Sequence, residues 1–484
     1  MKLGRKSLIA FIVTCFYVAG VVAAIEAVMT VRTAQGAIAW SVSLVSFPFV
    51  SVPAYLVFGR SKFNGVSQAY QERQADIDDL VNEMRTQLAP FKAGEDDSTE
   101  DLSALQRLTS MHQKISGMQL TRGNHAELLI DGEATFDSIL EGISKAKDYV
   151  FIQFYMFHDD GIGRRVQQAL IERANAGVRV FMLYDGVGSS GLPDSYVKKL
   201  EDAGVQVSKF KTTQGFRNQF QINFRNHRKM VVVDGLAGWL GGLNVGDEYM
   251  GLDPEFSPWR DTHLKLQGPS VIQLQSVCLW DWYWATREIP ELNWKPVVAQ
   301  DADATAMIVP TDPSQKMETA SLFFVTAINS ARERIWLTAP YFVPDEAVQK
   351  ALELAFLRGV DVRVLMSGKP DSLPVFMAGF HFMQILGEHG IKFYSYEPGF
   401  LHEKVMLVDD QVSTVGTANF DNRSFRLNFE VTALVVDEAF ASEVEAMLIK
   451  DFEHSKRIDI AGLDEKPFWW KVGVKLSRLA SPIL

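Results

Sequence analysis

The chain has 484 residues, with 48 Lys and Arg against 59 Asp and Glu, for a formal net charge of −11. Hydrophobic residues make up 47% of it and charged residues 22%, so the composition excludes a disordered chain and provides a large core. Its two cysteines, Cys15 and Cys278, exclude a disulfide framework and a cysteine-rich zinc site. The acidic balance argues against a nucleic-acid partner, because such binders usually have a strongly basic domain.

The chain begins with two uncharged stretches, at residues 8–25 and 37–58. Each is close to the ~20 residues that a helix needs to cross the hydrocarbon layer, so residues 1–60 are expected to form a membrane-embedded anchor of two spans. Basic residues flank the pair: Lys2, Arg5, Lys6, Arg60 and Lys62. The positive-inside rule then puts both ends of the anchor and the rest of the chain in the cytoplasm. The alternative is a signal peptide cleaved after Ala24, with the second stretch still stopping transfer.

Residues 61–120 are polar and helix-prone, with an amphipathic helix expected over residues 75–88 and an acidic loop over residues 94–101. We expect this segment to be a solvated linker. From about residue 125 the chain alternates strands and helices, as in the strand–helix–strand order of residues 149–184. That order predicts an α/β fold whose sheet is covered by helices on both faces.

The same pattern occurs twice, at residues 143–185 and 328–367, and a short glycine-containing strand follows each copy. The repeat is ~180 residues long, which is too long for a solenoid unit. We therefore expect two homologous halves in one chain, at residues 121–297 and 298–460, followed by an amphipathic tail at residues 461–484.

Each half contains one copy of a motif that carries chemistry, H-x-K-x(4)-D. The first copy is His227, Lys229 and Asp234, and the second is His402, Lys404 and Asp409. After six further residues each copy continues with a pair of small residues and an asparagine, at Asn244 and Asn419. A single HxK is usually an ordinary strand-end feature, but two equally spaced copies in repeated halves indicate a functional site.

The hydrophobic run after each Lys predicts a strand, and residues two apart on a strand share a face. His227 and Lys229 are therefore expected to project together, as are the two residues of the second copy. Each Asp has the opposite parity at the strand end. Asp234-Gly235 is a strong hairpin-turn signal, so we expect each Asp to fix the turn rather than to contact substrate. The returning strand would bring each Asn back alongside the His–Lys face.

A His, a Lys and an Asn directed at one point suit a phosphate group, because Lys and Asn donate hydrogen bonds to its oxygens. A neutral imidazole can attack phosphorus and form a covalent phosphohistidine. The second motif would supply the general acid that one motif lacks, by protonating the leaving oxygen. Two lysines and two asparagines can stabilise the charge on the phosphoryl oxygens, so neither a metal nor another cofactor is required.

The two motifs resemble those of the phospholipase D superfamily, whose hallmark is a duplicated H-x-K-x(4)-D followed by G-[GS]-x-N. The resemblance covers residues 120–460, and Thr417 in place of Gly or Ser is a mild departure from it. With its N-terminal spans, the chain is similar to the bacterial cardiolipin synthases of this superfamily. Further segments carry this similarity, at residues 36–40, 55–60, 258–262 and 419–426. The resemblance implies two phospholipase D-like α/β/α sandwich halves behind a membrane hairpin, in the bacterial cytoplasmic membrane.

The resemblance also implies a reaction between two molecules of phosphatidylglycerol. A histidine, in this family usually that of the first motif, His227, would attack one molecule and release glycerol. The terminal hydroxyl of the second molecule would then displace the histidine and give cardiolipin, with His402 acting first as acid and then as base. Alternatives are hydrolysis to phosphatidic acid, transfer to another alcohol, or a nuclease reaction, which the acidic net charge disfavours. An inactive membrane scaffold is disfavoured because both motifs are intact.

Each imidazole also needs a carboxylate on its other nitrogen to fix the tautomer. Glu430 lies 28 residues after His402, where the resemblance implies such a residue, and is expected to orient it. In the first half Asp261 is the candidate for His227. Glu255 is the second choice there, because it has the same 28-residue offset but lies in a proline-containing loop.

Anionic membrane lipids are the expected partners of two further segments. Residues 203–233 contain no Asp or Glu. The cations of this window are Lys209, Lys211, Arg217, Arg225, Arg228 and Lys229, and its phenylalanines are Phe210, Phe216, Phe220 and Phe224. This composition suits an anionic headgroup, unless the phenylalanines fill the core. The tail, with Phe468, Trp469 and Trp470 before Lys471, is expected to be an interfacial helix, and its alternative is packing against the core.

Overall fold

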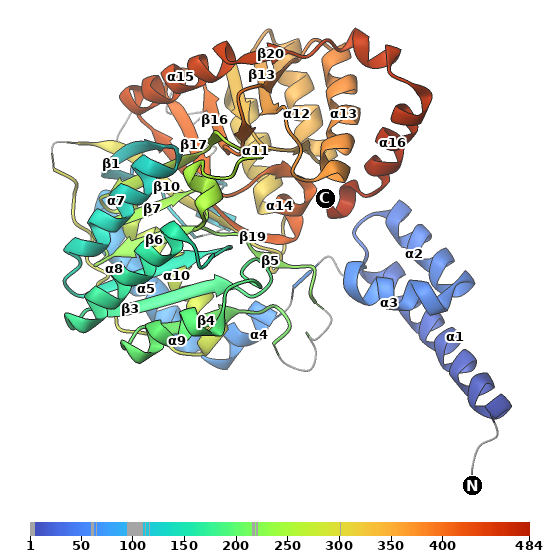
Figure 1. The fold of residues 1–484 in the computed structure, drawn as a ribbon, viewed down its shortest axis with the longest axis horizontal. Coiled ribbons are helices and arrows are strands. Elements are labelled where there is room, and N and C mark those ends of the chain that lie inside the picture. Colours follow the sequence, from blue (N-terminus) through green and yellow to red (C-terminus); the bar gives the residue numbers. More distant parts are fainter. Residues whose placement is uncertain are drawn as a thin grey trace.

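The computed structural model describes residues 5–59, 62–63, 65–93, 110–111, 113–115, 117–214, 218, 221–300 and 302–484. Figure 1 shows a large body, in which strands lie between helices, and an N-terminal part that projects from it. The N-terminal part holds α1 (Arg5–Thr30), α2 (Ala34–Ser46) and α3 (Pro48–Phe58). The body, referred to below as the catalytic body, holds the remaining elements.

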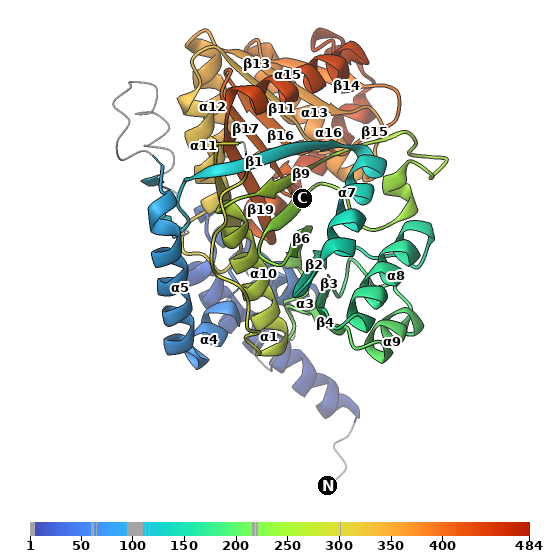
Figure 2. The same cartoon turned by 90° about the vertical axis from the view of Figure 1, so that its left-hand side faces the viewer.

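The first half of the body is built on seven long strands: β1 (Thr121–Ile130), β2 (Tyr149–Phe154), β3 (Arg179–Asp185), β4 (Gln206–Phe210), β6 (Met230–Val233), β7 (Ala237–Gly241) and β9 (Thr262–Gln267). Its helices are α7 (Asp131–Lys145), α8 (Gly161–Asn175), α9 (Asp194–Asp202) and α10 (Ser270–Thr286). All six residues of β2 are buried, because helices cover both faces of the sheet. Val150 and Ile152 pack with α7, α8 and α9, whereas Tyr149 and Phe151 belong to the core under α10 (Figure 2).

The second half repeats this order with β10 (Ala304–Thr311), β11 (Arg334–Thr338), β13 (Asp361–Ser367), β14 (Lys392–Tyr396), β16 (Val405–Val408), β17 (Val412–Gly416) and β19 (Asn428–Val436). Its helices are α11 (Thr319–Ser330), α12 (Glu346–Leu357), α13 (Leu373–Glu388), the short α14 (Asn422–Arg426) and α15 (Glu438–Glu453). The short β20 (Ser455–Arg457) pairs with β14 at the outer edge.

The strands of both halves form one continuous sheet, in the order β20-β14-β13-β11-β16-β17-β19-β10-β1-β9-β7-β6-β2-β3-β4. Strands β10 and β1 join the halves in antiparallel fashion, with Ala306 opposite Thr121. Read outward from this join, the two halves show the same order of equivalent strands. The predicted α/β class with two similar halves is therefore confirmed, and the two halves share a sheet.

Short strand pairs also cross from one half to the other. β5 (Arg225–Asn226) runs parallel to β19, and β15 (Phe400–Leu401) runs parallel to β8 (Trp259–Arg260). A third short pair, β12 (Phe342–Val343) with β18 (Phe420–Asp421), lies within the second half. The residue that follows β5 is the first motif histidine, and the residue that follows β15 is the second. The crossing strands therefore position both motifs at the seam between the halves.

The second predicted span, residues 37–58, is not one helix, because α2 ends at Ser46 and α3 begins at Pro48. Proline has no N–H for a helical hydrogen bond and disfavours helical angles in the residue before it, here Phe47 with φ −134° and ψ 56°. Among the helices of the described residues, α1 alone is long and apolar enough to cross a membrane. The second predicted span is thus divided into two shorter helices, and the expected two-span anchor stays a prediction.

The segment after the anchor is not a solvated linker where the structure describes it. It contains α4 (Gly65–Glu72), α5 (Gln74–Leu88) and the short turn η1 (Ala89–Phe91). Ile77, Met84 and Leu88 of α5 are buried in the main core of the body. These residues form the amphipathic face expected from the sequence, and packing removes their apolar surface from water. The acidic loop at residues 94–101 lies outside the described residues.

The tail contains η3 (Ala461–Glu465), α16 (Phe468–Leu479) and η4 (Ser481–Ile483). One face of α16 packs on α13, with Val474 buried and the ring of Trp470 lying 5.1 Å from that of Phe380. The opposite face is exposed and apolar, with Phe468, Trp469, Val472, Leu476 and Leu479. The helix thus combines contact with the core and an uncovered apolar stripe.

Candidate active site

The crossing strands hold each motif histidine against the opposite half. The backbone N–H of His227 donates to the carbonyl of Phe429 (2.9 Å), and that of His402 donates to the carbonyl of Arg260 (2.8 Å). Each histidine is therefore fixed by the other half before its own strand, β6 or β16, begins. Both side chains are nearly buried, with exposed fractions of 13% for His227 and 10% for His402.

The two orienting carboxylates are exchanged between the halves. Nδ1 of His227 lies 3.0 Å from both carboxylate oxygens of Glu430, and Nδ1 of His402 lies 2.7 Å from Oδ2 of Asp261. The pairing within each half expected from the sequence is therefore wrong, although both residues do contact an imidazole. The reason is the crossing strands, which align each histidine with the neighbouring strand of the other half. Glu255 is exposed in its loop, where its N–H donates to Asp253.

The carboxylate on Nδ1 determines which form each imidazole takes. It favours the neutral tautomer with its proton on Nδ1, so the lone pair of Nε2 is available for chemistry. Burial lowers the pKa of His227 to about 4 and lowers the pKa of His402 well below its usual value. Although burial opposes ionisation of Glu430, the adjacent His227 holds its pKa below the usual range, whereas burial raises the pKa of Asp261. Burial therefore favours the neutral form of both imidazoles before substrate binds.

The two motif lysines are buried beside the histidines. Nζ of Lys229 donates to the carbonyl of His227 (2.7 Å), and Nζ of Lys404 donates to the carbonyl of His402 (2.5 Å). Burial lowers the pKa of Lys404 to about 8 and also lowers that of Lys229. The ammonium of Lys229 lies 5.5 Å from the ring centre of Tyr155. Each lysine thus keeps two further N–H donors, which suit an anion at the seam.

The aspartates of the motifs lie at the far ends of β6 and β16. Asp234 accepts hydrogen bonds from the backbone N–H groups of three residues that lead into β2: Lys147, Asp148 and Tyr149. Asp409 accepts the equivalent bonds from Arg332, Glu333 and Arg334 before β11. Both aspartates have a left-handed backbone, with φ values of 55° and 51°. They fix the turns and strand positions and, at seven residues from each histidine, lie about 20 Å from it.

The two asparagines differ in their surroundings. The side-chain amide of Asn244 donates to the hydroxyl of Tyr249 (2.8 Å) and accepts from the N–H of Met156 (3.1 Å). The side-chain oxygen of Asn419 is buried, and within the described part of the chain it has no hydrogen-bond partner. Asn419 therefore keeps an unused acceptor while its side chain also hydrogen-bonds to Asp421, and both polar atoms of the Asn244 side chain are bound to protein groups.

Three residues that the sequence did not suggest bind the carboxylate of Glu430. Hydroxyls of Thr417 (2.6 Å) and Ser424 (2.9 Å) and the amide of Asn428 (3.1 Å) donate to it. In the first half Gly242 takes the place of Thr417, and a Cβ there would lie 1.9 Å from Oδ1 of Asp261. Thr417, where the sequence departs from the family pattern, thus supplies a hydrogen-bond donor to Glu430. A comparison of the two motifs could have indicated this extra donor in the second half.

Aromatic rings surround the imidazoles. The ring of Tyr155 lies 5.1 Å from that of His227. The rings of Trp259, Phe400 and Tyr249 lie 5.2, 5.9 and 6.4 Å from that of His402. Such walls exclude water and strengthen electrostatic interactions inside the site.

The basic window at residues 203–233 is divided between the core and the site. Phe210 and Phe224 are buried, in agreement with the alternative that phenylalanines fill the core. Phe216, Arg217 and Phe220 lie outside the described residues. Arg228 forms a buried ion pair with Asp281 (2.6 Å) and is therefore structural.

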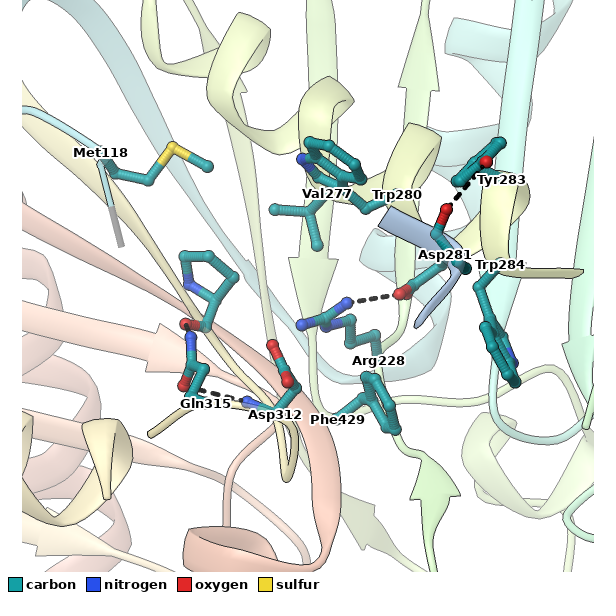
Figure 3. A pocket seen from close by; sticks show the side chains of 12 residues that line it. Met118, Arg228, Val277, Trp280, Asp281, Tyr283, Trp284, Asp312, Gln315 and Phe429 are labelled. Carbon is teal, nitrogen blue, oxygen red and sulfur yellow. Dashed lines mark hydrogen bonds and ion pairs between the residues drawn. The ribbon is translucent and has the colours of Figure 1, made fainter. Parts of the chain in front are cut away.

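That ion pair lies at a cavity of about 220 Å³ on the α10 side of the sheet. Figure 3 shows Arg228 pointing to Asp281, with Trp280, Trp284 and Phe429 around it. Arg228 lies between His227 and Lys229 in an extended segment, so its side chain points to the opposite side from theirs. The cavity lies behind the reaction site and is separate from it.

Among the described residues, one group has the spacing of metal ligands: His158, Asp160 and Glu248. The carboxylate of Asp160, however, caps α8 by accepting from the N–H of Gly163 (2.9 Å) and also accepts from the N–H of Asp247 (2.8 Å). His158 is paired with Glu248 at 3.3 Å. Hydrogen bonds and an ion pair between residues 158–160 and residues 247–248 account for this group.

Two similar α/β halves on one sheet, with an HxK motif from each meeting at the seam, define a phospholipase D-like enzyme. The model of the family "Cardiolipin synthase, PLD-like domain" matches residues 139–257 and again residues 324–452. A second model, "Phospholipase_D-nuclease N-terminal", matches residues 18–60. The chain belongs to the cardiolipin synthase family of this superfamily and is a phosphatidyltransferase.

Individual relatives agree with this assignment. The chain is 46% identical over 474 residues to "Cardiolipin synthase A" of Pseudomonas putida strain F1, covering 98% of both chains. It is 46% identical over 479 residues to the protein of the same name from Pseudomonas entomophila strain L48, again covering 98% of both. The crystal structure of phosphatidylserine synthase from Haemophilus influenzae Rd KW20 covers 80% of this chain and 100% of its own, with a TM-score of 0.57 and 14% identity. This last likeness concerns the fold alone.

Proposed function

We propose that the protein is a cardiolipin synthase that transfers a phosphatidyl group from one phosphatidylglycerol to the terminal hydroxyl of a second, with release of glycerol. The observation that carries this proposal is the pair of buried imidazoles at the seam, each bound through Nδ1 to a carboxylate of the opposite half. This arrangement provides one nucleophile and one acid–base group for a phosphodiester. The names of the relatives, cardiolipin synthases, supply the identity of the product as cardiolipin.

In the first step Nε2 of His227 attacks phosphorus, and the bond from phosphorus to the glycerol oxygen breaks. The bound phosphodiester places a negative charge beside His402, which raises the pKa of its imidazole, so Nε2 of His402 takes up a proton from solvent. His402 can then give its proton to the leaving glycerol oxygen. The product of this step is a phosphatidyl group attached to His227, with His402 neutral.

In the second step the incoming hydroxyl gives its proton to His402 while its oxygen attacks phosphorus and the P–N bond breaks. Cardiolipin is released, His227 is neutral again, and His402 returns the proton to solvent when the product leaves. The step uses the same groups as the first in reverse order, so the transfer is reversible. Lys229 and Lys404 stabilise the charge on the phosphoryl oxygens.

We place this reaction at the bacterial inner membrane, with the catalytic body on the cytoplasmic side. The exposed apolar stripe of α16 supports a second contact with the bilayer. Its cations, Lys471, Lys475 and Arg478, suit the headgroups of anionic lipids.

The test uses purified protein in detergent–lipid micelles, with phosphatidylglycerol as the only lipid and a chelator present. Cardiolipin and glycerol are expected in equal amounts, and both are lost in His227→Ala and His402→Ala. His389→Ala is the matched control, because this histidine is exposed on the surface. Phosphatidic acid as the main product would instead identify a hydrolase or an enzyme that requires another alcohol. No product at all would contradict the choice of substrate.

A further inference from the structure

The lengths of the three anchor helices determine which of them can cross the hydrocarbon layer of a membrane. α1 has 26 residues and is therefore about 39 Å long, more than the ~30 Å of the hydrocarbon layer. α2 has 13 residues and α3 has 11, so they are about 20 Å and 16 Å long. Neither of the two shorter helices can span the layer.

Contacts between the helices show that α2 and α3 form a hairpin beside one half of α1. At the tip of this hairpin the ring of Phe49 lies 5.1 Å from that of Phe16, and a Cβ on Gly20 would lie 2.4 Å from the carbonyl oxygen of Leu44. At its open end the rings of Trp40 and Tyr55 lie 5.2 Å apart. The tip therefore reaches the middle of α1, and both open ends lie near the C-terminal end of α1.

The N-terminal half of α1 extends beyond the hairpin tip. Four of its apolar side chains, Leu8, Ile9, Phe11 and Ile12, are 45–63% exposed. Both views show α1 pointing away from the catalytic body, with its N-terminal end farthest from it (Figures 1 and 2). An uncovered apolar helix of this kind requires lipid around it.

The turn between α1 and α2 lies on the catalytic body. Nε of Arg32 in this turn is 2.7 Å from Oε1 of Glu318, which also pairs with Arg426 at 3.2 Å. On the other side of the hairpin, the N–H of Phe63 donates to the carbonyl of Pro313 (3.1 Å). Two complete spans would place Arg32 across the membrane from Phe63 and the body, which is incompatible with the ion pair.

The break at Phe47 is suited to the interior of a bilayer, where backbone groups must be satisfied within the protein. The N–H of Phe47 donates to the carbonyl of Ser43 (2.8 Å). The hydroxyl of Ser51 lies 2.8 Å from the same carbonyl and 2.9 Å from that of Phe47, so its proton is shared between the two.

We propose that α1 is the single membrane span and that α2 and α3 form a re-entrant hairpin, which enters the bilayer from the catalytic side and returns to it. The N-terminus and the catalytic body then lie on opposite faces of the membrane. In the sequence, Lys2, Arg5 and Lys6 precede α1, and Arg32, Arg60 and Lys62 follow it. Flanking charge is therefore equal on the two sides of α1, and the contacts of Arg32 distinguish the topologies.

The test uses single cysteines in the full chain after Cys15→Ser and Cys278→Ala, which remove its two native thiols. The reporters are Ser7→Cys at the start of α1, Gln35→Cys at the start of α2, and Lys199→Cys on α9, which are all exposed positions. Each is labelled with a membrane-impermeant maleimide in right-side-out and in inside-out bacterial vesicles. Labelling after solubilisation gives the total reactive thiol and does not depend on the proposed reaction.

We expect Gln35→Cys and Lys199→Cys to react in the same vesicle preparation and Ser7→Cys to react in the opposite one. A two-span anchor reverses this pattern, with Ser7→Cys reacting together with Lys199→Cys and Gln35→Cys reacting alone. That result, or reaction of all three positions in one preparation, would overturn the proposal. As a second measurement, Arg32→Cys with Glu318→Cys is expected to be joined by a short bis-maleimide in intact membranes, and the absence of a cross-link would contradict the shared side.

Discussion

The hydrogen bond between His227 and Glu430 joins residues 203 positions apart in the chain, and the bond between His402 and Asp261 joins residues 141 apart. Such distant partners leave no local pattern. The motif histidines and lysines could be predicted because their spacing is local and repeated. The pairing with carboxylates could not, since an equal offset of 28 residues indicates similarity between halves and not contact across the seam.

Replacing Glu430 tests the exchanged pairing. Glu430→Gln keeps the volume but removes the charge that fixes the tautomer and stabilises the imidazolium. We expect the transfer rate to fall by roughly 100- to 10,000-fold. Glu255→Gln, at the position with the same sequence offset, is the matched control and is expected to retain full activity. Equal activity in the two variants would contradict the assignment.

Thr417 is a positioning residue, because its hydroxyl binds Glu430 and it acts through that carboxylate. Thr417→Val preserves the shape and removes the hydroxyl that donates at 2.6 Å. A lost hydrogen bond to a charged group costs about 1.5 kcal/mol or more, which corresponds to a decrease in kcat of about tenfold with KM nearly unchanged. Thr417→Ser restores the donor and should recover most of kcat. A change in KM alone would argue against this role.

Besides the protonation of the acid His402, two shifted groups of the free enzyme contribute to the dependence of kcat/KM on pH. Neutral His227 exists above its pKa of about 4, so activity should be lost only as the pH falls towards that value. Charged Lys404 exists below its pKa of about 8, so activity should also decline as the pH rises past it. A rate profile between pH 3 and 10 measures both limbs. An acid limb near 6.5, the pKa of an ordinary histidine, would contradict the effect of burial.

At the scale of elements, strands and amphipathic helices could be predicted because their side chains follow a period. The break in the second apolar stretch was visible as Pro48, but proline is tolerated within membrane helices, so its presence alone did not decide the shape. The sequence could not show whether α5 packs on the body or stays in solvent, since both arrangements have the same amphipathic pattern. The helical tail could be predicted, but not that one face of α16 packs on α13 while the other stays exposed.

The exposed stripe of α16 is expected to contact lipid directly. In the cysteine-free chain, Leu476→Cys labelled with an environment-sensitive fluorophore should be quenched by doxyl lipids after reconstitution into anionic vesicles. Leu357→Cys on α12 is the matched control, because Leu357 is 77% exposed and Leu476 is 61% exposed. It should not be quenched. Equal quenching at the two positions would contradict an interfacial role for α16.

At the scale of the whole molecule, the halves are joined by backbone pairing and by buried charge. Arg260 of the first half is bound to Asp451 of the second at 2.8 and 2.9 Å and lies 3.2 Å from Glu403. Burial and the charge of Asp451 raise the pKa of Glu403 to about 8, while Arg260 opposes that shift. The two halves should therefore unfold together.

Removing Arg260 leaves Asp451 and Glu403 buried without their cation. Arg260→Ala is expected to lower the free energy of unfolding by about 3–5 kcal/mol, as for other broken buried ion pairs. Arg164→Ala removes the exposed pair with Asp159 at 2.7 Å and should leave the free energy of unfolding nearly unchanged, because solvent screens exposed ion pairs. Thermal unfolding in detergent, followed by circular dichroism, measures both. Two separate transitions in the unchanged protein would contradict the joint unfolding of the halves.

The exchange of carboxylates also has a consequence during synthesis. A growing chain that ends before residue 430 contains the complete first motif, but its nucleophilic imidazole still lacks the carboxylate that orients it. The second histidine appears after its own partner, Asp261, yet the pair meets only once β15 has crossed to β8. We therefore expect prematurely terminated products to be inactive towards the phosphodiesters of the surrounding membrane.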